Sequence, residues 1–283
     1  MAKTHWKKFP HPDKAYDYPG PALKKNWPRL HRGDCEPFPD EATLGRLVAS
    51  NAGLAVPVPV KEAATILQDA WRAYHRGDFG TAVELGVSLG PIGYNVANKA
   101  ANIYATYLEE DRKRKESYFQ QAAQRGEELI ELAPGLVNAG YFYAQALGRY
   151  SQCISVAKAL AQGTGGRVKQ ALEKAIAVDA KHCDAHIALG AFHAEVIDKV
   201  GAMVGGLTYG ASKDAGVKNF EKALSLNPDS AIARIEYANG LVMMFGKSRL
   251  EKAGALYEEA AACEAADAME RLDVELAKAE LAD

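Results

Sequence analysis

A short residue pattern that recurs along the chain constrains its fold more than any other feature. Small residues alternate with a large aliphatic or aromatic residue at intervals of three and four, the spacing that places side chains on one face of an α-helix. The clearest copies lie at residues 168–175, 216–223 and 253–260, with an earlier one at 122–134. A helix repeated in this way predicts helical hairpins that stack in chain order around a shared core.

The composition is that of an ordinary globular protein and narrows the function classes. At 283 residues the chain can bury a large core without a disulfide framework or a structural metal. Its net charge of −2 gives no general reason to expect nucleic acid or an anionic membrane as a partner. The four cysteines are widely separated, and residues 1–20 lack the apolar stretch of a secretory or lipoprotein signal. We therefore expect reduced thiols, no membrane span, no cofactor and a cytoplasmic location.

Residues 1–60 differ from the rest and are predicted to form an N-terminal arm. They hold nine of the twelve prolines, so long helices are not expected there, and the one predicted helix covers residues 40–50 with Asp40 as its N-cap. Residues 1–32 carry eight Lys or Arg against two Asp. Aromatic side chains are costly to leave in water, so we expect the arm to pack on the helical body. Its aromatic residues are Trp6, Phe9, Tyr16, Tyr18, Trp27 and Phe38.

Residues 61–283 are predicted to be a helical body, because helical spacing continues almost throughout and strand signals are essentially absent. Gly163, Gly165 and Gly166 are expected to break the chain before residue 168. The glycine-rich segment 201–210 is expected to be a close-packed or flexible connector. The predicted helices are 61–76, 79–89, 94–108, 115–132, 136–160, 168–178, 183–200, 217–226, 230–245 and 250–263, followed by a capping helix at 267–281. A break of the helix 136–160 near residues 149–152 is left open.

These residues resemble the tetratricopeptide-repeat family over positions 61–265. The resemblance implies an all-α fold, a right-handed stack of antiparallel helical hairpins that forms an α-solenoid, here with a proline-rich N-terminal arm. Lys174 and Lys222 occupy equivalent positions 48 residues apart, whereas the family repeat is about 34 residues, so the array is divergent. The chain also resembles, over fewer features, the T component of TRAP transporters. The matching segments are Gly77-Asp78-Phe79-x2-Ala82, Leu172-x2-Ala175, Leu189-Gly190, Phe220-x2-Ala223-x4-Pro228 and Ala253-x3-Tyr257-x2-Ala260.

A stripe of polar residues on the predicted helix 94–108 is the main candidate binding site. Its spacing gathers the side chains on one helix face, and a second polar stripe on the following inner helix is expected to extend the same groove. Amides can bond a peptide backbone or a small polar ligand, and two cations favour an anionic group. The alternative is an ordinary solvated helix face. The candidate residues are Asn95, Asn98, Lys99, Asn102, Tyr141, Gln145 and Arg149.

Three histidines form a second constellation with two possible interpretations. His182 and His186 are four residues apart on one face of a predicted helix, His193 follows near that face, and Cys183 adds a thiol. Imidazoles at this spacing can chelate zinc. The favoured interpretation is that His186 and His193 pack between helices, since they flank Leu189-Gly190, and that the protein holds no metal.

No nucleophile, paired-carboxylate or phosphate-loop motif is present, so we expect a non-catalytic scaffold that binds a protein or peptide in a concave groove. The alternatives are a carrier or sensor of a small polar ligand, a transport accessory protein, and a metal-dependent enzyme at the histidines. The charged run 109–116 is predicted to be a solvated loop. The basic aromatic arm is compatible with RNA, but a packing segment of this composition is favoured. The partner and the oligomeric state are left open.

Overall fold

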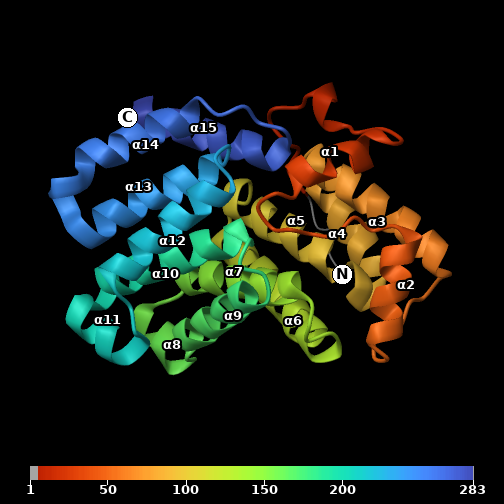
Figure 1. Cartoon of the computed structure of the whole chain (residues 1–283), viewed down its shortest axis with the longest axis horizontal. Helices are drawn as coiled ribbons and strands as arrows, with labels where there is room; N and C mark the ends of the chain where they lie inside the picture. The colour runs from red at the N-terminus through yellow and green to blue at the C-terminus, as the bar shows by residue number, and fades with distance from the viewer. Residues whose placement is uncertain (1–5, 283) are drawn as a thin grey trace. The chain divides into compact units, whose positions relative to one another are not determined.

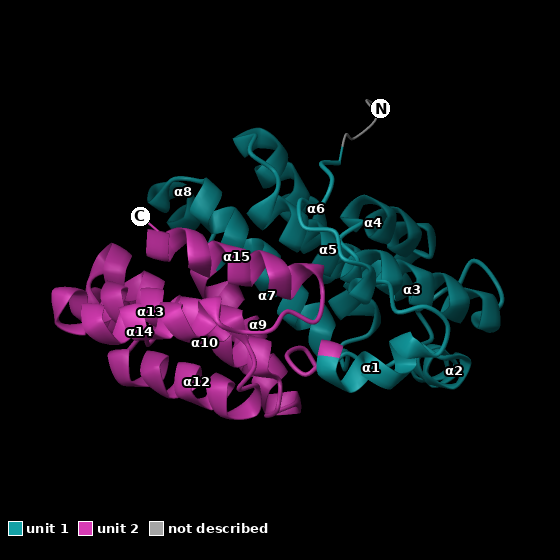
Figure 2. Ribbon diagram, turned by 90° about the horizontal axis from the view of Figure 1, so that it is seen from above, with its two compact units in different colours: residues 1–29, 36–164 teal, residues 30–35, 165–283 magenta. Residues whose placement is uncertain are grey.

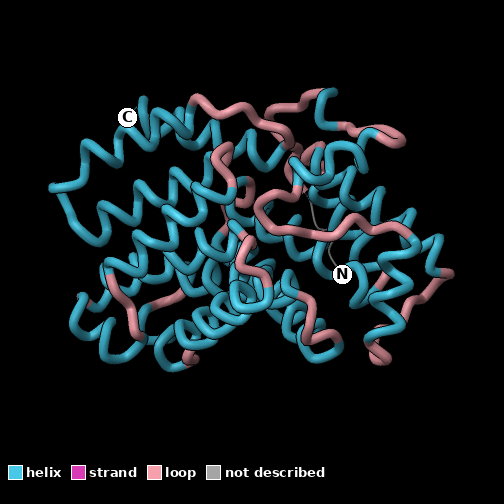
Figure 3. The backbone as a smooth tube through the Cα atoms, viewed as in Figure 1, coloured by secondary structure: helices cyan, strands magenta, loops and turns pink. Residues whose placement is uncertain are grey.

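A computed structural model describes residues 6–282, and every regular element in that range is helical, which confirms the all-α prediction (Figure 3). Residues 1–5 of the predicted arm and residue 283 lie outside the described part. The chain divides into two compact units, coloured separately in Figure 2. Unit 1 comprises Met1–Arg29 and Glu36–Thr164, and unit 2 comprises Leu30–Cys35 and Gly165–Asp283. The units are thus divided elsewhere than at residue 60, the boundary between arm and body that the sequence suggested.

Unit 1 contains most of the predicted arm and the first helical hairpins, whose helices are labelled in Figure 1. Its elements are η1 (Lys14–Tyr16), α1 (Ala22–Leu30, which ends in unit 2), α2 (Glu41–Ser50), α3 (Val60–His75), α4 (Phe79–Ser88), η2 (Gly90–Gly93), α5 (Tyr94–Tyr107), α6 (Arg112–Leu132), α7 (Val137–Cys153) and α8 (Val156–Ala161).

Local chemistry explains where these helices begin and end. The Asp40 side chain accepts a hydrogen bond from the Thr43 amide at 3.0 Å, so α2 has the predicted N-cap. Gly77 adopts a φ of +86°, which lets the chain reverse between α3 and α4. Asp78 then caps α4 through the Thr81 amide at 3.3 Å. These turns give the short connections that an antiparallel hairpin needs.

In unit 1 each long helix packs on the next one in the chain, from α3 through α7. Helix α5 also contacts α3 and α7, so all residues from Asn95 to Ala105 are buried. Helix α4 and the start of α5 approach each other closely at Gly86 and Gly93. A Cβ on Gly93 would lie 2.1 Å from the Gly86 carbonyl oxygen, so only glycine fits there. The predicted stacking of hairpins in chain order is confirmed within this unit.

Arm residues in unit 1 make aromatic contacts with its helices. The Trp6 ring lies 4.5 Å from the Tyr104 ring and 5.0 Å from the Tyr118 ring, between centroids. The Trp27 ring is buried 5.7 Å from the Trp71 ring of α3, and its indole N–H donates to the Glu36 carbonyl at 2.6 Å. These contacts join the arm to the same hydrophobic core as the helices.

Replacing Trp6 with alanine should lower the free energy of unfolding by about 1–2 kcal/mol, because the half-buried ring loses its contacts with two tyrosines. Urea denaturation followed by far-UV circular dichroism measures the change. Lys8→Ala is the control, since Lys8 is exposed and lies two residues away. Equal stability of the two variants would show that the contacts of the Trp6 ring do not stabilise unit 1.

Unit 2 contains six residues of the predicted arm and the later hairpins (Figure 1). Its helices after α9 (Thr164–Val178, which begins in unit 1) are α10 (Cys183–Val200), α11 (Ala202–Tyr209), α12 (Lys213–Leu226), α13 (Ala231–Phe245), α14 (Leu250–Ala261) and α15 (Ala268–Ala282), with η3 (Gly246–Arg249) before α14.

The packing of unit 2 also follows the repeated pattern. Helix α10 contacts α12 and α13, α13 contacts α14, and α15 packs on α13 and α14 as the predicted cap. Ala223, a small residue of the repeat, is fully buried in a cluster with Cys183, Ile187 and Ala233. Phe220 is also fully buried and lies against Gly190 and Gly240, where a Cβ would come within 2.9 Å of its ring.

The segment Leu30–Cys35 is attached to unit 2 by polar contacts. Arg32 pairs with Asp229 at 2.7 Å, and the Gly33 carbonyl accepts from the Asp184 amide at 3.0 Å. His31 and Asp34 are buried and lie 2.9 Å apart, Nδ1 to Oδ1. A Cβ on Gly33 would overlap the Asp184 carboxylate, so the segment approaches α10 closely.

The helix predicted at 136–160 is divided at residues 154–155 into α7 and α8. Three further expectations about secondary structure were wrong. Helix α1 forms in the proline-rich arm and contains Pro28. The glycine-rich connector contains helix α11, which lies between Gly201 and Gly210, both at positive φ. Helix α9 begins at Thr164, so the glycines at positions 165 and 166 lie within it and do not break the chain.

Candidate functional site

The candidate site on α5 lies inside unit 1 and is built from amide side chains. Asn98 is fully buried, Asn102 is 1% exposed, and Asn95 is 9% exposed. The alternative interpretation of this stripe, an ordinary solvated helix face, is therefore excluded. The residues do share one helix face, as their spacing predicted, but neighbouring helices cover that face.

Glu36 of the arm lies at one end of this site. Its carboxylate accepts hydrogen bonds from Asn95 Nδ2, at 3.1 and 3.3 Å to its two oxygens, and from Asn138 Nδ2 of α7. The Glu36 backbone is held in turn by the Trp27 indole. A carboxylate thus bridges two helices through neutral amide donors.

Lys99 lies one helical turn beyond Asn95 and is 4% exposed. Its ammonium lies 5.2 Å from the centroid of the Tyr74 ring and 5.8 Å from that of Trp71. Aromatic faces offset part of the cost of removing a cation from water. The predicted cation of the site is therefore present on the amide face, in contact with the aromatic core.

The two predicted stripes meet at Asn102 and Gln145. Asn102 Nδ2 donates to Gln145 Oε1 at 2.9 Å and to the Phe142 carbonyl at 3.3 Å. Tyr141 is buried on the same helix, whereas Arg149 is half-buried and donates to Gln152 at 3.3 Å. The structure therefore brings α5 and α7 together as expected. A ligand-binding role for these residues stays a prediction.

Each of the three asparagines keeps one buried polar atom without a hydrogen-bond partner among the residues described. These atoms are Asn95 Oδ1, Asn98 Nδ2 and Asn102 Oδ1. Asn98 Oδ1 accepts from Arg125 Nε at 2.8 Å, and burial lowers the pKa of that guanidinium. A buried amide atom without a hydrogen-bond partner destabilises the fold. This helix face therefore has one unused hydrogen-bond donor, Asn98 Nδ2, and two unused acceptors, Asn95 Oδ1 and Asn102 Oδ1.

Sequence reasoning missed three residues of this cluster. Glu36 lies in the proline-rich arm, where no periodicity pointed toward α5. Asn138 stands in the first turn of α7, and Arg125 in the middle of the long helix α6. Tyr141, Gln145 and Arg149 are spaced by four residues, and the same spacing continued toward the N-terminus reaches position 137, next to Asn138. This spacing is the one sequence signal for Asn138.

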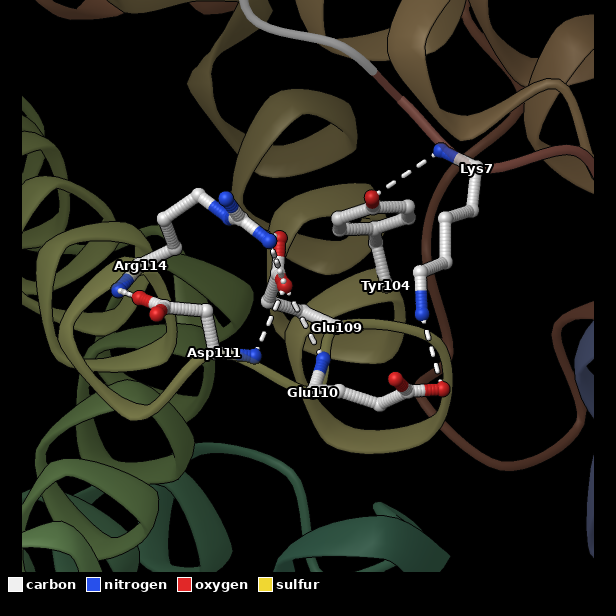
Figure 4. Close-up of polar contacts among 6 residues, drawn as sticks. All are labelled: Lys7, Tyr104, Glu109, Glu110, Asp111 and Arg114. Carbon is white, nitrogen blue, oxygen red and sulfur yellow. Dashed lines mark hydrogen bonds and ion pairs between the residues drawn. The ribbon is translucent and has the colours of Figure 1, made fainter.

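A second polar cluster occupies the turn between α5 and α6 (Figure 4). The buried Glu109 carboxylate accepts from the amides of Glu110 and Asp111 and from the Arg114 guanidinium, all at 2.9 Å. Lys7 of the arm donates its backbone N–H to the Tyr104 hydroxyl at 3.0 Å and pairs with Glu110 at 2.8 Å. The prediction of a solvated loop over the charged run 109–116 was therefore wrong: residues 109–111 form an ordered turn attached to the arm, and residues 112–116 begin α6.

The Glu109 cluster predicts a pH dependence. The hydrogen bond from Arg114 holds the pKa of Glu109 below the ordinary value of 4.5. The stabilisation is therefore complete above that value and is lost as the pH falls through the lowered pKa. Glu109→Gln should cost about 1–2 kcal/mol at neutral pH, and the difference from wild type should shrink toward acid. Urea titrations across the pH range test this, and a pH-independent difference would contradict it.

The histidines are placed in unit 2 as the packing interpretation expects. His186 Nδ1 lies 2.8 Å from Asn219 Oδ1, and His193 Nδ1 accepts from the Ser212 amide at 3.4 Å; both rings are buried. His182 caps α10 by accepting from the Ala185 amide at 3.0 Å. Within residues 6–282 no group of three His, Cys, Asp or Glu side chains is arranged to hold a metal ion.

The stacked helical hairpins and their small-residue contacts define a tetratricopeptide-like helical-repeat protein. A solved structure with this fold is TTC0263, a thermophilic tetratricopeptide-repeat protein of Thermus thermophilus. It is 16% identical, with a TM-score of 0.54, over 77% of this chain and 99% of that chain. MamA is also similar, at 18% identity and a TM-score of 0.36, over 77% of this chain and 95% of its own.

A sequence comparison assigns the chain to one family within this fold class. The model of the family "Regulator of microtubule dynamics protein 1-3" matches residues 93–280, about two thirds of the chain, and the protein belongs to that family. No curated protein matches the chain in sequence. No described helix is both long enough and apolar enough to cross a membrane.

Proposed function

We propose that this protein is a non-catalytic helical-repeat scaffold that binds a protein partner along a groove of unit 1. The observation that carries the proposal is the accessible edge of the polar face shared by α5 and α7, where Gln145 contacts the buried Asn102 and where Gln145 and Arg149 are only half-buried. Helical hairpins present side chains from successive repeats side by side, so a partner can be recognised over several helices. A cytoplasmic location and independence from cofactors are parts of the same proposal.

Microtubules are the first partner to test, because the family is named for regulation of microtubule dynamics. The wild-type protein should pellet with polymerised tubulin in a saturable manner. Gln145→Ala with Arg149→Ala should weaken this, since both side chains are half-buried and can be removed without opening the core. The control is Lys218→Ala with Lys222→Ala, which changes two exposed residues of α12.

The possible results separate the parts of the proposal. Wild type that stays in the supernatant would exclude microtubules as the partner. Variants that all pellet like wild type would show that the α5–α7 face is not the binding surface. Loss of pelleting in the control pair as well would assign binding to charge in general.

A small polar ligand is the second candidate, and the three unpartnered asparagine atoms favour it. Such a ligand would supply one acceptor and two donors to α5. Native mass spectrometry of the purified protein should then show a fixed mass increment. The increment should disappear in Asn102→Leu, a variant of similar volume that lacks the amide. A wild-type mass equal to that of the chain alone would exclude this candidate.

A further inference from the structure

We propose that the basic surface around the start of α6 docks a carboxylate-rich segment of the protein partner. The proposal rests on the scaffold function above and specifies the chemistry of the partner. The basic surface lies in unit 1 near the turn shown in Figure 4. Its cations are Lys7, Arg112, Lys113, Arg114, Lys115, Arg149 and Lys158.

Contacts from several elements bring these cations together. Lys7 of the arm pairs with Glu110, and Arg112 Nε of α6 donates to the Cys153 carbonyl at the end of α7, at 3.0 Å. Lys158 of α8 lies 5.7 Å above the Tyr150 ring of α7. The surface therefore depends on the fold of unit 1 and is more than a charged run in the sequence.

The carboxylates near this surface are already engaged. Glu109 accepts from Arg114, Glu110 pairs with Lys7, and Glu116 lies 3.5 Å from Arg112. Asp111 is the N-cap of α6 and accepts from the Arg114 amide at 2.8 Å. Every nearby acid thus has a donor.

Three cations form no ion pair with a carboxylate of the described residues: Lys113, Lys115 and Lys158. Lys115 lies near enough to Glu110 to lower the pKa of that carboxyl, but the ion pair of Glu110 is with Lys7. Lys113 and Lys158 are exposed, and Lys115 is half-buried. The Cys153 thiol lies within this set of charges: burial and the Glu116 carboxylate raise its pKa, while Lys115, Arg112 and Arg149 oppose that rise. Positive charge therefore accumulates on this face, although the whole chain has a net charge of −2.

The placement of these cations is unfavourable for the helix itself. The first turn of α6 contains no acidic residue and begins with four consecutive cations, Arg112 to Lys115. Cations near a helix N-terminus oppose the helix dipole and repel one another. A bound segment rich in Asp or Glu would relieve both effects and would be attracted over several ångströms of solvent. Charge complementarity thus identifies an acidic peptide as the occupant.

The direct test uses a fluorescent oligoglutamate peptide and the full chain. Wild type should bind it, and Lys113→Glu with Lys115→Glu should weaken binding by about tenfold or more. Lys113→Ala with Lys115→Ala should weaken binding less. This variant keeps the test valid if the charge-reversal variant does not fold. Lys218→Glu with Lys222→Glu is the matched control, with the same charge change on α12, and should bind like wild type. Added salt should weaken wild-type binding.

Each outcome decides the proposal. No peptide binding by wild type, or equal loss in the patch and control variants, would overturn it. Tighter binding of oligouridylate than of oligoglutamate at equal charge would assign the surface to nucleic acid and also overturn it. Peptide binding without microtubule pelleting would leave this surface standing while excluding microtubules. Microtubule pelleting that is unaffected by the Lys113 and Lys115 substitutions would keep microtubules as the partner and exclude this basic surface as the docking site.

Discussion

Gly93→Ala is expected to lower the free energy of unfolding of unit 1 by more than about 3 kcal/mol. The new Cβ would lie 2.1 Å from the Gly86 carbonyl oxygen, and Gly86 in turn faces the Gly93 carbonyl. Because both obstacles are backbone atoms, α4 and the start of α5 must separate. Gly93 has a φ of −99°, which alanine tolerates, so the cost arises from close approach alone.

Tryptophan fluorescence during urea denaturation measures this loss in the right unit, since Trp6, Trp27 and Trp71 all belong to unit 1. Gly148→Ala is the matched control, because a Cβ there meets nothing within 4 Å inside α7. Alanine at that position should raise stability by about 0.5–1 kcal/mol. Equal effects of the two substitutions would refute the close-contact explanation.

Ala223→Trp is expected to have the second large effect, a loss of about 3 kcal/mol or more from overpacking. Ala223 is fully buried, and its carbonyl lies 3.3 Å from the Cys183 thiol of α10. An indole at this position must push α12 away from α10 and α13. Lys222→Trp is the control, because that neighbouring side chain is exposed on the same helix.

Hydrogen exchange with mass spectrometry locates the damage from Ala223→Trp without relying on fluorescence, to which the new indole would contribute. Peptides from α10, α12 and α13 should exchange faster, while those from α3 to α5 should keep their protection. Uniformly faster exchange in both units would show that the two unfold together. Unchanged exchange in α12 would contradict the packing assigned to the repeat.

The helices that sequence reasoning placed well are those with strong local signals. Helix α10 covers residues 183–200 as predicted, because its apolar spacing is regular and ends at Gly201. Helix α1 is not predicted by proline content, because only the positions of its prolines make it compatible with a helix. Pro21 precedes α1, where proline is tolerated, and Pro28 lies near its end. Helix α11 was missed because Gly205 and Gly206 weaken its local preference, while packing of Gly205 against Val196 stabilises it.

The sequence predicted that the residues of the candidate site share one helix face, but it did not predict that this face is buried. Spacing alone placed Asn95, Asn98 and Asn102 together. Their burial follows from α3, α6 and α7 surrounding α5, a tertiary arrangement that the alanines of this helix permit. Glu36 reaches Asn95 across 59 residues of sequence. A contact of that kind has no local signature.

The attachment of Leu30–Cys35 to unit 2 has a consequence for biosynthesis. Arg32 leaves the ribosome early, yet Asp229, its partner, follows 197 residues later. At about 5–20 residues per second, the segment would wait roughly 10–40 s for that contact. Nascent chains that stop before Asp184, whose amide donates to the Gly33 carbonyl, should therefore have a protease-sensitive site near residue 32, and the Asp229 contact should add the last of its protection.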